Sequence, residues 1–181
     1  MKSLSINLSL LVSILILASC SNSMSLEEYF VKKGQDNSYV AANLSSDVFL
    51  SGANLLPEER EKIASIRKIN FLAFKKDNDT VKANYEADKT QLKKILNDEA
   101  YKSLMKFNGD GNQVKLVYTG NDVNIEELIV FAESDKMGFM VARLLGDDMK
   151  PKNFYNLVKM MDKLNLKQAE SFTKDLDLSD I

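Results

Sequence analysis

Short segments of apolar residues, some of them alternating with polar ones, recur along this chain in the manner typical of β-strands. Five segments with apolar runs or alternation are predicted as strands: 39–44, 69–74, 114–119, 125–132 and 138–145. The connections between the last three are short and polar, which favours an antiparallel three-strand meander at the C-terminal end of the domain. Segment 69–74 carries apolar residues on both faces, which favours a central strand.

Other segments repeat their apolar residues every three or four positions, which predicts helices. The predicted helices are 26–33, a segment beginning at Pro57, a segment with Tyr85, Leu92, Ile95 and Leu96, a short segment with Tyr101, Leu104 and Met105, and a segment beginning at Pro151. Ser25 is expected to cap the first helix and Gly34 to end it. Residues 47–50 fit either a strand or a helical turn. The predicted fold class is α+β, a mostly antiparallel sheet of about five strands with helices packed on one face.

The N-terminus has the three parts of a secretory signal peptide. Lys2 supplies a positive charge, residues 8–17 form an apolar run, and small residues precede Cys20. The apolar run is shorter than the roughly 20 residues that a spanning helix needs, which disfavours a retained transmembrane anchor. Leu17-Ala18-Ser19-Cys20 is similar to the lipobox of bacterial lipoproteins, whose cysteine is acylated and becomes the mature N-terminus. The alternative is a soluble exported protein with a free cysteine.

These patterns divide the chain into a cleaved signal peptide, 1–19, and a lipidated cysteine with a short polar tether, 20–25. A single α+β domain, 26–165, is followed by a loosely packed helix or frayed tail, 166–181. Fully extended, five tether residues span at most about 17 Å, so the domain is expected close to a membrane. Ser21 stands where some bacteria use Asp for inner-membrane retention, and the tether has no acidic run. We therefore expect the outer membrane, with the domain facing the periplasm.

Composition excludes several classes of chemistry. The chain has no histidine, one cysteine and a formal net charge of −2. Without histidine there is no Ser-His or Cys-His catalytic pair and no imidazole metal ligand. With Cys20 acylated, no thiol remains for a disulfide or a metal site. A nearly neutral chain gives no reason to expect nucleic-acid binding. We expect no metal, no cofactor and no nucleic acid, and catalysis would have to use carboxylates, Lys, Tyr, Ser or Thr.

Charged residues near the last predicted strands are the candidates for a site. Asp147 and Asp148 close the last strand, where helix capping or simple solvation is the favoured role. Arg143 lies within the same, otherwise apolar strand. An edge or solvent-facing position is favoured for Arg143, since in the core it would need a carboxylate partner. Asp147 with an acid of a neighbouring strand, Glu127, is the pair that a carboxylate-dependent hydrolase would use.

Three other patterns carry less information. Residues 108–112 superficially resemble a calcium loop, but they have one carboxylate and no terminal Glu, so a turn is strongly favoured. Asp79-Thr80-Val81 resembles the acceptor site of periplasmic O-glycosylation in Bacteroidetes, which would make Thr80 the modified residue. Several methionines could form an adaptable binding surface, although core filling is favoured. They are Met137, Met140, Met149, Met160 and Met161.

Five segments of the chain match a known family in the same order. They are Leu26-x-x-Tyr29-Phe30-Val31-x-Lys33, Ile66-Arg67-Lys68-Ile69-Asn70-Phe71-Leu72-Ala73-Phe74, Tyr101-x-x-Leu104-Met105, Glu127-Leu128-Ile129-Val130-Phe131 and Gly138-Phe139-x-Val141-Ala142-Arg143-Leu144-Leu145-Gly146-Asp147-x-Met149. Together they resemble the small Bacteroidetes lipoproteins that carry the domain of unknown function 4252. The resemblance implies an exported lipoprotein with no assigned activity and no known catalytic residues, in an envelope-stress or regulatory setting.

Two hypotheses about function follow. The first is a non-enzymatic binding or interaction module, held in the membrane by the lipid on Cys20, whose partner is another envelope protein, a peptide or a lipid. The second is a carboxylate-dependent hydrolase acting on envelope glycans, which needs two carboxyl groups facing each other across a cleft.

Overall fold

A computed structural model describes residues 24–51, 53–75, 82–109, 111–135, 138–152 and 154. Several sequence predictions therefore lie outside the described residues: the signal peptide 1–19, the lipidated Cys20, the glycosylation at Thr80 and the helix or tail at 166–181.

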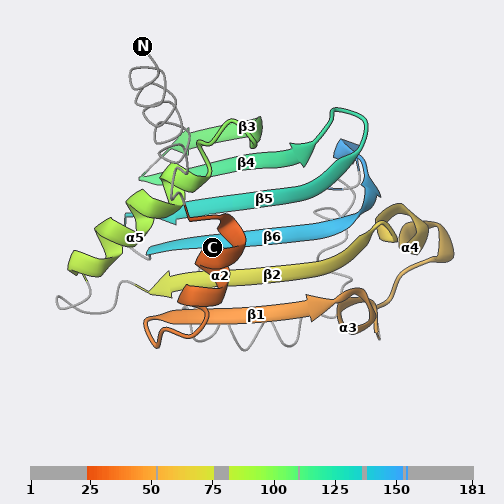
Figure 1. The fold of residues 1–181 in the computed structure, drawn as a ribbon. Coiled ribbons are helices and arrows are strands. Elements are labelled where there is room, and N and C mark those ends of the chain that lie inside the picture. Colours follow the sequence, from red (N-terminus) through yellow and green to blue (C-terminus); the bar gives the residue numbers. More distant parts are fainter. Residues whose placement is uncertain are drawn as a thin grey trace, which may run out of the picture.

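Six strands form one antiparallel sheet in the order β1-β2-β6-β5-β4-β3 (Figure 1). The strands are β1 Tyr39–Ser45, β2 Ile66–Lys75, β3 Lys102–Gly109, β4 Asn112–Gly120, β5 Ile125–Ser134 and β6 Gly138–Met149. Strands β4, β5 and β6 are consecutive neighbours, which confirms the predicted C-terminal meander. Strand β2 lies between β1 and β6, which confirms its central position. The α+β fold class is confirmed, with six strands instead of about five.

The sixth strand corrects one sequence prediction. The helix predicted around Leu104 and Met105 is wrong, because these residues belong to strand β3. The i, i+3, i+4 spacing of three apolar residues mimicked a helix, whereas β3 is an edge strand that is exposed along most of its length and so lacks alternation. A tight hairpin joins β3 to β4, with Gly109 opposite Asn112 and Gly111 at φ 76°. That positive φ suits glycine, and the favoured turn at 108–112 is confirmed.

The helices are α2 Leu26–Lys33, α3 Ser46–Leu50, α4 Pro57–Ile63 and α5 Lys82–Ile95. Ser25 caps α2 as predicted, because its Oγ accepts from the Glu28 N–H at 3.1 Å while the Glu28 side chain accepts from the Ser25 N–H at 2.7 Å. Gly34 closes α2 by donating its N–H to the Phe30 carbonyl at 2.8 Å. Helix α3 decides the ambiguity at 47–50 in favour of a helical turn.

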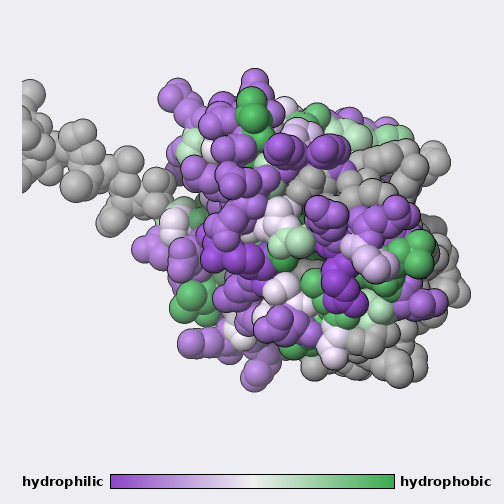
Figure 2. Space-filling model, turned by 90° about the vertical axis from the view of Figure 1, so that its right-hand side faces the viewer, coloured by the Kyte–Doolittle hydropathy of each residue, from purple (hydrophilic) through white to green (hydrophobic). Residues whose placement is uncertain are grey.

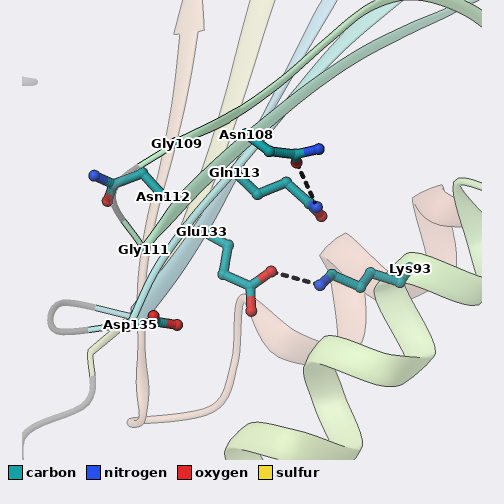
Figure 3. Close-up of a pocket in the computed structure, with 8 residues that line it drawn as sticks. All are labelled: Lys93, Asn108, Gly109, Gly111, Asn112, Gln113, Glu133 and Asp135. Atoms are coloured by element: carbon teal, nitrogen blue, oxygen red, sulfur yellow. Dashed lines mark hydrogen bonds and ion pairs between the residues drawn. The ribbon is translucent and has the colours of Figure 1, made fainter.

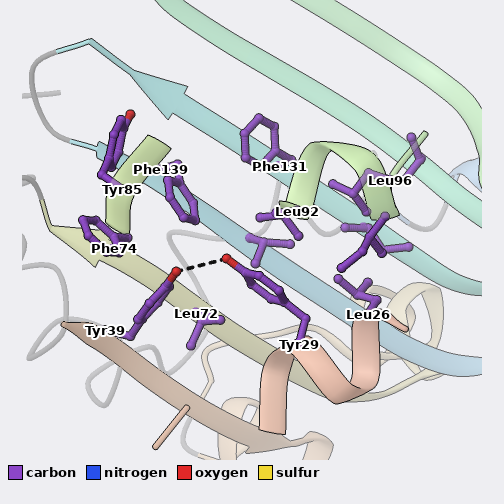
Figure 4. Close-up of a cluster of buried hydrophobic side chains, with 14 residues drawn as sticks. Leu26, Tyr29, Tyr39, Leu72, Phe74, Tyr85, Leu92, Leu96, Phe131 and Phe139 are labelled. Carbon is purple, nitrogen blue, oxygen red and sulfur yellow. Dashed lines mark hydrogen bonds between the residues drawn. The ribbon is translucent and has the colours of Figure 1, made fainter. Parts of the chain in front are cut away.

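Helices α2 and α5 cover one face of the sheet, where the larger apolar cluster lies (Figures 1 and 4). Aromatic rings fill its centre: the Phe74 and Phe139 rings stack with centroids 5.5 Å apart, and Tyr39 meets Phe74 edge-on at 5.0 Å. The buried members are Leu26, Tyr29, Tyr39, Leu72, Phe74, Tyr85, Leu92, Ile95, Leu96, Val117, Ile129, Phe131, Phe139 and Val141.

A second apolar cluster lies on the opposite face of the sheet. Its buried members are Leu44, Ile63, Ile66, Tyr118, Ile125, Leu128, Leu144 and Met149. The strand register explains the division, since Val141 faces Phe131 on one face while Leu144 faces Leu128 on the other. The predicted packing of helices on one face therefore holds for α2 and α5. Helices α3 and α4 contribute Val48, Leu50 and Ile63 to the second cluster, because the central strands are apolar on both faces.

A buried polar network ties α2, β1 and α5 together within the larger cluster. The Tyr29 and Tyr39 hydroxyl oxygens are 3.0 Å apart, and the Tyr39 O–H donates to Asp88 Oδ2 at 2.8 Å (Figure 4 shows the tyrosine pair). Lys33 Nζ lies 2.6 Å from Asp88 Oδ1, and both of these side chains are almost fully buried. Burial is the main reason that the pKa of Tyr29 and of Tyr39 is raised, so both phenols stay protonated.

Replacing Tyr39 by Phe removes one hydroxyl from this network and leaves Asp88 with fewer donors. We expect the Tyr39→Phe variant to lose about 1–3 kcal/mol of unfolding free energy, the usual cost of a missing hydrogen bond to a buried charged group. Urea denaturation followed by circular dichroism measures this loss.

The matched control is Tyr118→Phe, because the Tyr118 hydroxyl donates at 2.7 Å to Asp122, whose side chain is 85% exposed. Water can replace that bond, so the control should lose less than about 1 kcal/mol. Equal losses in the two variants would show that the buried network contributes nothing special.

Candidate functional site

Arg143 and Glu127 form an ion pair on the helix-covered face of the sheet. Arg143 Nε contacts Glu127 Oε1, and the two side chains are 14% and 11% exposed. The expected edge or solvent-facing position of Arg143 is therefore wrong, because β6 lies between β2 and β5 and α2 covers this face. The alternative, a core-facing arginine with a carboxylate partner, describes what the structure shows. Glu27 of α2 lies at the rim of the pair, with its Oε2 at 3.9 Å from Arg143 Nη2.

Asn70 extends this polar pair across the sheet. It stands opposite Arg143 in the β2–β6 register and is 7% exposed. Its Oδ1 is buried and accepts no hydrogen bond from the described residues. An unsatisfied buried acceptor costs about 1–3 kcal/mol, so the larger cluster carries a polar defect next to its ion pair.

Asp147 does not join this pair. It bonds Arg67 Nε at 2.8 Å, and both side chains are largely exposed, 71% for Asp147 and 63% for Arg67. Each acid of the predicted hydrolase pair thus has its own cationic partner, on β6 for Glu127 and on β2 for Asp147. This arrangement gives no support to the two acids acting together across a cleft.

A polar hollow of about 510 Å³ lies where the β3–β4 hairpin meets the end of β5 and the helix α5 (Figure 3). Carboxamide, carboxylate and lysine side chains dominate its lining. The lining residues are Lys93, Asn108, Gly109, Gly111, Asn112, Gln113, Glu133 and Asp135. Gln113 Nε2 donates to Asn108 Oδ1 at 2.9 Å, so the two amides hold one another in place. Within the described ranges, no group of three or more acidic or thiol side chains is placed to hold a metal ion.

Glu133 is the charged centre of this hollow. Its carboxylate lies 2.5 Å from Lys93 Nζ and 3.1 Å from Lys89 Nζ, one turn apart on α5. Burial alone would raise the pKa of Glu133, but the hydrogen bonds and charges of the two lysines outweigh burial and lower it. An acid held ionised in this way binds cationic or hydrogen-bonding groups, and it is poorly suited to the role of general acid.

A groove of about 730 Å³ runs between the start of α2 and the helix α5. Its lining mixes apolar and polar side chains: Met24, Ser25, Leu26, Ala87, Thr90, Gln91, Lys94, Ile95, Asp98, Ala100 and Tyr101. Gln91 Nε2 donates to the sulfur of Met24 at 3.3 Å, which links the start of the chain before α2 to the helix α5 across the groove. Met24, one of the lining residues, stands four residues after Cys20 in the sequence.

The end of the molecule at which α3 and α4 lie has a mostly hydrophilic described surface, with separate small hydrophobic patches (Figure 2). None of the described helices is long and apolar enough to cross a membrane.

Comparison with known families agrees with the order of segments seen in the sequence. The model of the family described as Domain of unknown function (DUF4252) matches residues 30–157. The chain belongs to this family. No curated protein and no solved structure matches the chain.

The DUF4252 match begins inside α2 and includes all six strands, so the Arg143–Glu127 pair and the polar hollow belong to the domain that defines the family. Of the buried network, Lys33, Tyr39 and Asp88 fall within the match, and Tyr29 lies one residue before it. Sequence reasoning missed the hollow and the network. One signal was available, since Lys89 and Lys93 stand four residues apart among the apolar positions of α5. Lysines that stand among the buried apolar positions of a helix need acidic partners. The partner of both lysines is Glu133.

Replacing Arg143 by Met leaves Glu127 buried without a cation inside the DUF4252 domain. We expect Arg143→Met to lose about 3–5 kcal/mol of unfolding free energy. Adding Glu127→Gln to the same chain should recover most of this loss, because the uncompensated charge is gone. Both values come from denaturant unfolding at neutral pH.

Arg67→Met is the control, since its partner Asp147 is exposed. That variant should lose less than about 1 kcal/mol. If Arg143→Met costs no more than Arg67→Met, Glu127 does not depend on the pair for its burial.

The lowered pKa of Glu133 predicts a pH-dependent contribution to stability. Ionised Glu133 stabilises the domain fully above the pKa of an unfolded glutamate, about 4.3. The contribution is lost as the pH falls through the lower folded pKa. Glu133→Gln should therefore be less stable than the wild type near neutral pH, and the difference should narrow steadily from about pH 5 downward. Unfolding free energies measured across this range for both chains give the result.

Glu86→Gln is the comparison variant, because Glu86 contacts Lys89 but its side chain is 65% exposed. It should show no comparable narrowing. A difference between wild type and Glu133→Gln that is independent of pH would contradict the prediction.

Proposed function

We propose that this chain is a non-enzymatic interaction module that a lipid on Cys20 holds in the outer membrane, facing the periplasm. The observation that carries the proposal is the free edge of strand β3. β3 is the last strand of the sheet, and no other strand in the described part of the chain pairs with its outer side. Edges of this kind accept an additional strand through main-chain hydrogen bonds.

The side chains of β3 are those of a contact surface. Leu104, Met105 and Phe107 are 38%, 50% and 58% exposed, three of the large hydrophobic side chains that the domain leaves in contact with solvent. They come from one short segment, and clustered exposed hydrophobic residues mark interaction sites more often than scattered ones do. A partner strand could cover them and satisfy the edge at the same time.

The fixed position of α2, close to Cys20 in the sequence, supports the anchoring part of the proposal. Ser25 already caps α2, and α2 is locked to β1 and α5 by the Asp88 network. A lipid on Cys20 would therefore be at most five residues, about 17 Å, from a fixed point of the fold. The domain would be held against the membrane and would meet partners there.

The hydrolase alternative receives less support from the described acids. Glu127 is paired with Arg143, and Glu133 is paired with two lysines that lower its pKa. A glycan hydrolase needs one carboxylic acid with a raised pKa that can give up its proton. The envelope-stress or regulatory setting that the family resemblance implies stays a prediction.

The anchor is tested by the intact mass of the full chain purified from membranes. We expect a mature chain that begins at Cys20 and carries the added mass of acyl chains, whereas Cys20→Ala should keep residues 1–19 and lack that mass. A wild-type chain that begins elsewhere, or that begins at an unmodified Cys20, would contradict the proposal.

The interaction is tested by placing a photoreactive amino acid at Phe107 in cells that make the full chain. Irradiation should join the chain covalently to a discrete second protein. The same label at Val31, which is 61% exposed on α2, is the control and should give no such product. Equal products from both positions, or none from Phe107, would remove β3 as the interaction surface.

A further inference from the structure

The outer strand β3 presents two different chemistries on its two faces. On the face that α2 and α5 cover, Lys106 stands directly opposite Lys115 of β4. On the other face, Met105 and Phe107 stand opposite Leu116 and Val114 and are largely exposed. A strand that completed this edge would need acidic side chains on one face and apolar side chains on the other.

Lys106 and Lys115 are the reason that an added strand would need an acid on this face. Like charges directly opposite one another on neighbouring strands are destabilising. Besides burial, the charge of Lys106 contributes to the lowered pKa of Lys115. Lys115 Nζ finds oxygen partners at Leu96 and Asn97, at 2.9 and 2.6 Å, but both are uncharged. The described residues of β3 contain two lysines and no acid. Pairing with the β3 strand of a second copy would add to this repulsion.

The chain itself contains a segment with the complementary pattern. Residues 175–178 read Asp-Leu-Asp-Leu, so in an extended conformation both acids would point to one face and both leucines to the other. We propose that this acidic, alternating segment of the same chain adds to the outer side of β3, with Asp175 and Asp177 beside Lys106 and Leu176 and Leu178 beside Met105 and Phe107.

The length of chain between the two segments allows this pairing. Phe154 packs against the cluster on the face where Met105 and Phe107 lie. Twenty residues separate Phe154 from Asp175, and when extended they would span up to about 66 Å. The sheet of six strands is only about 24 Å wide between its edge strands, at about 4.8 Å per neighbour. The segment can therefore reach β3 from any route across the sheet.

The same pairing has a consequence for regulation, which rests on the proposed function. If partners bind through the β3 edge, the segment at 175–178 competes with them, and a partner has to displace it. A partner strand that displaces this segment would need the same pattern, with acidic side chains on one face and apolar side chains on the other.

Hydrogen exchange of the full lipidated chain in detergent micelles tests the pairing, read by mass spectrometry over residues 102–109. We expect a chain that ends at residue 173 to exchange the outward-pointing amides of β3 at least tenfold faster than the full chain. Asp175→Lys with Asp177→Lys should have the same effect, and adding Lys106→Glu to that chain should restore protection. The peptide covering β1, the other edge, should not change.

Asp162→Lys with Glu170→Lys is the matched control, because it makes the same change of charge outside the alternating segment. If this variant accelerates exchange equally, or if truncation at residue 173 leaves exchange in β3 unchanged, the pairing is overturned. A second copy could instead cover the edge. In that case the protection of the β3 amides would disappear when the protein is diluted, and mixing labelled with unlabelled chains would produce mixed pairs. This result would overturn the pairing within one chain.

The two proposals can fail separately. Cross-linking from Phe107 to residues 175–178 without any second protein would support this pairing and count against the partner. The opposite result would be a second protein captured equally by the full and truncated chains, with the same hydrogen exchange in β3 for both chains. It would support the partner and count against this pairing.

Discussion

The packing of the domain depends on one buried carboxylate, that of Asp88. Burying an ionised acid is very costly unless charged and hydrogen-bonding partners surround it. Here the partners come from α2 and β1, with Lys33 at 2.6 Å and the Tyr39 hydroxyl at 2.8 Å. Helix α5 can therefore sit in only one place relative to α2 and the sheet. The second attachment of α5, Lys89 and Lys93 to Glu133 of β5, fixes its rotation about its own axis.

This lock determines how the rest of the molecule is presented. Helix α2 begins one residue after its Ser25 cap, so whatever precedes it is attached to a rigid point on the helix-covered face of the sheet. Helix α2 lies beside Arg143 and Glu127, with Glu27 at 3.9 Å from Arg143, and both side chains of the charge pair are largely buried between the central strands and this helix. The edges β1 and β3 lie at opposite ends of the sheet. Of the two, β3 combines an exposed backbone edge with exposed hydrophobic side chains.

Sequence patterns predicted the elements whose burial is regular. Strands β4, β5 and β6 and the central β2 were predictable because apolar residues and short polar turns recur there. Strand β3 was not, because an exposed edge strand has no buried face to impose alternation, and its apolar residues happened to fall at helical spacing. The Asp88 network was beyond reach for another reason. Tyr39 and Asp88 stand 49 positions apart in the sequence, and only the fold brings them together.

An uncovered β3 would be a liability for the domain, and more so under the proposed membrane anchoring. Exposed edge strands with hydrophobic side chains template edge-to-edge association, and proteins usually protect them with charge, bulges or a covering segment. Strand β3 has two lysines and a register shift between Ser103 and Met105, which reduce self-pairing. They do not reduce pairing with an acidic strand, for which Lys106 opposite Lys115 is attractive. The same lysines then have two effects at this edge. They disfavour pairing with the β3 strand of a second copy, and they favour pairing with an acidic strand.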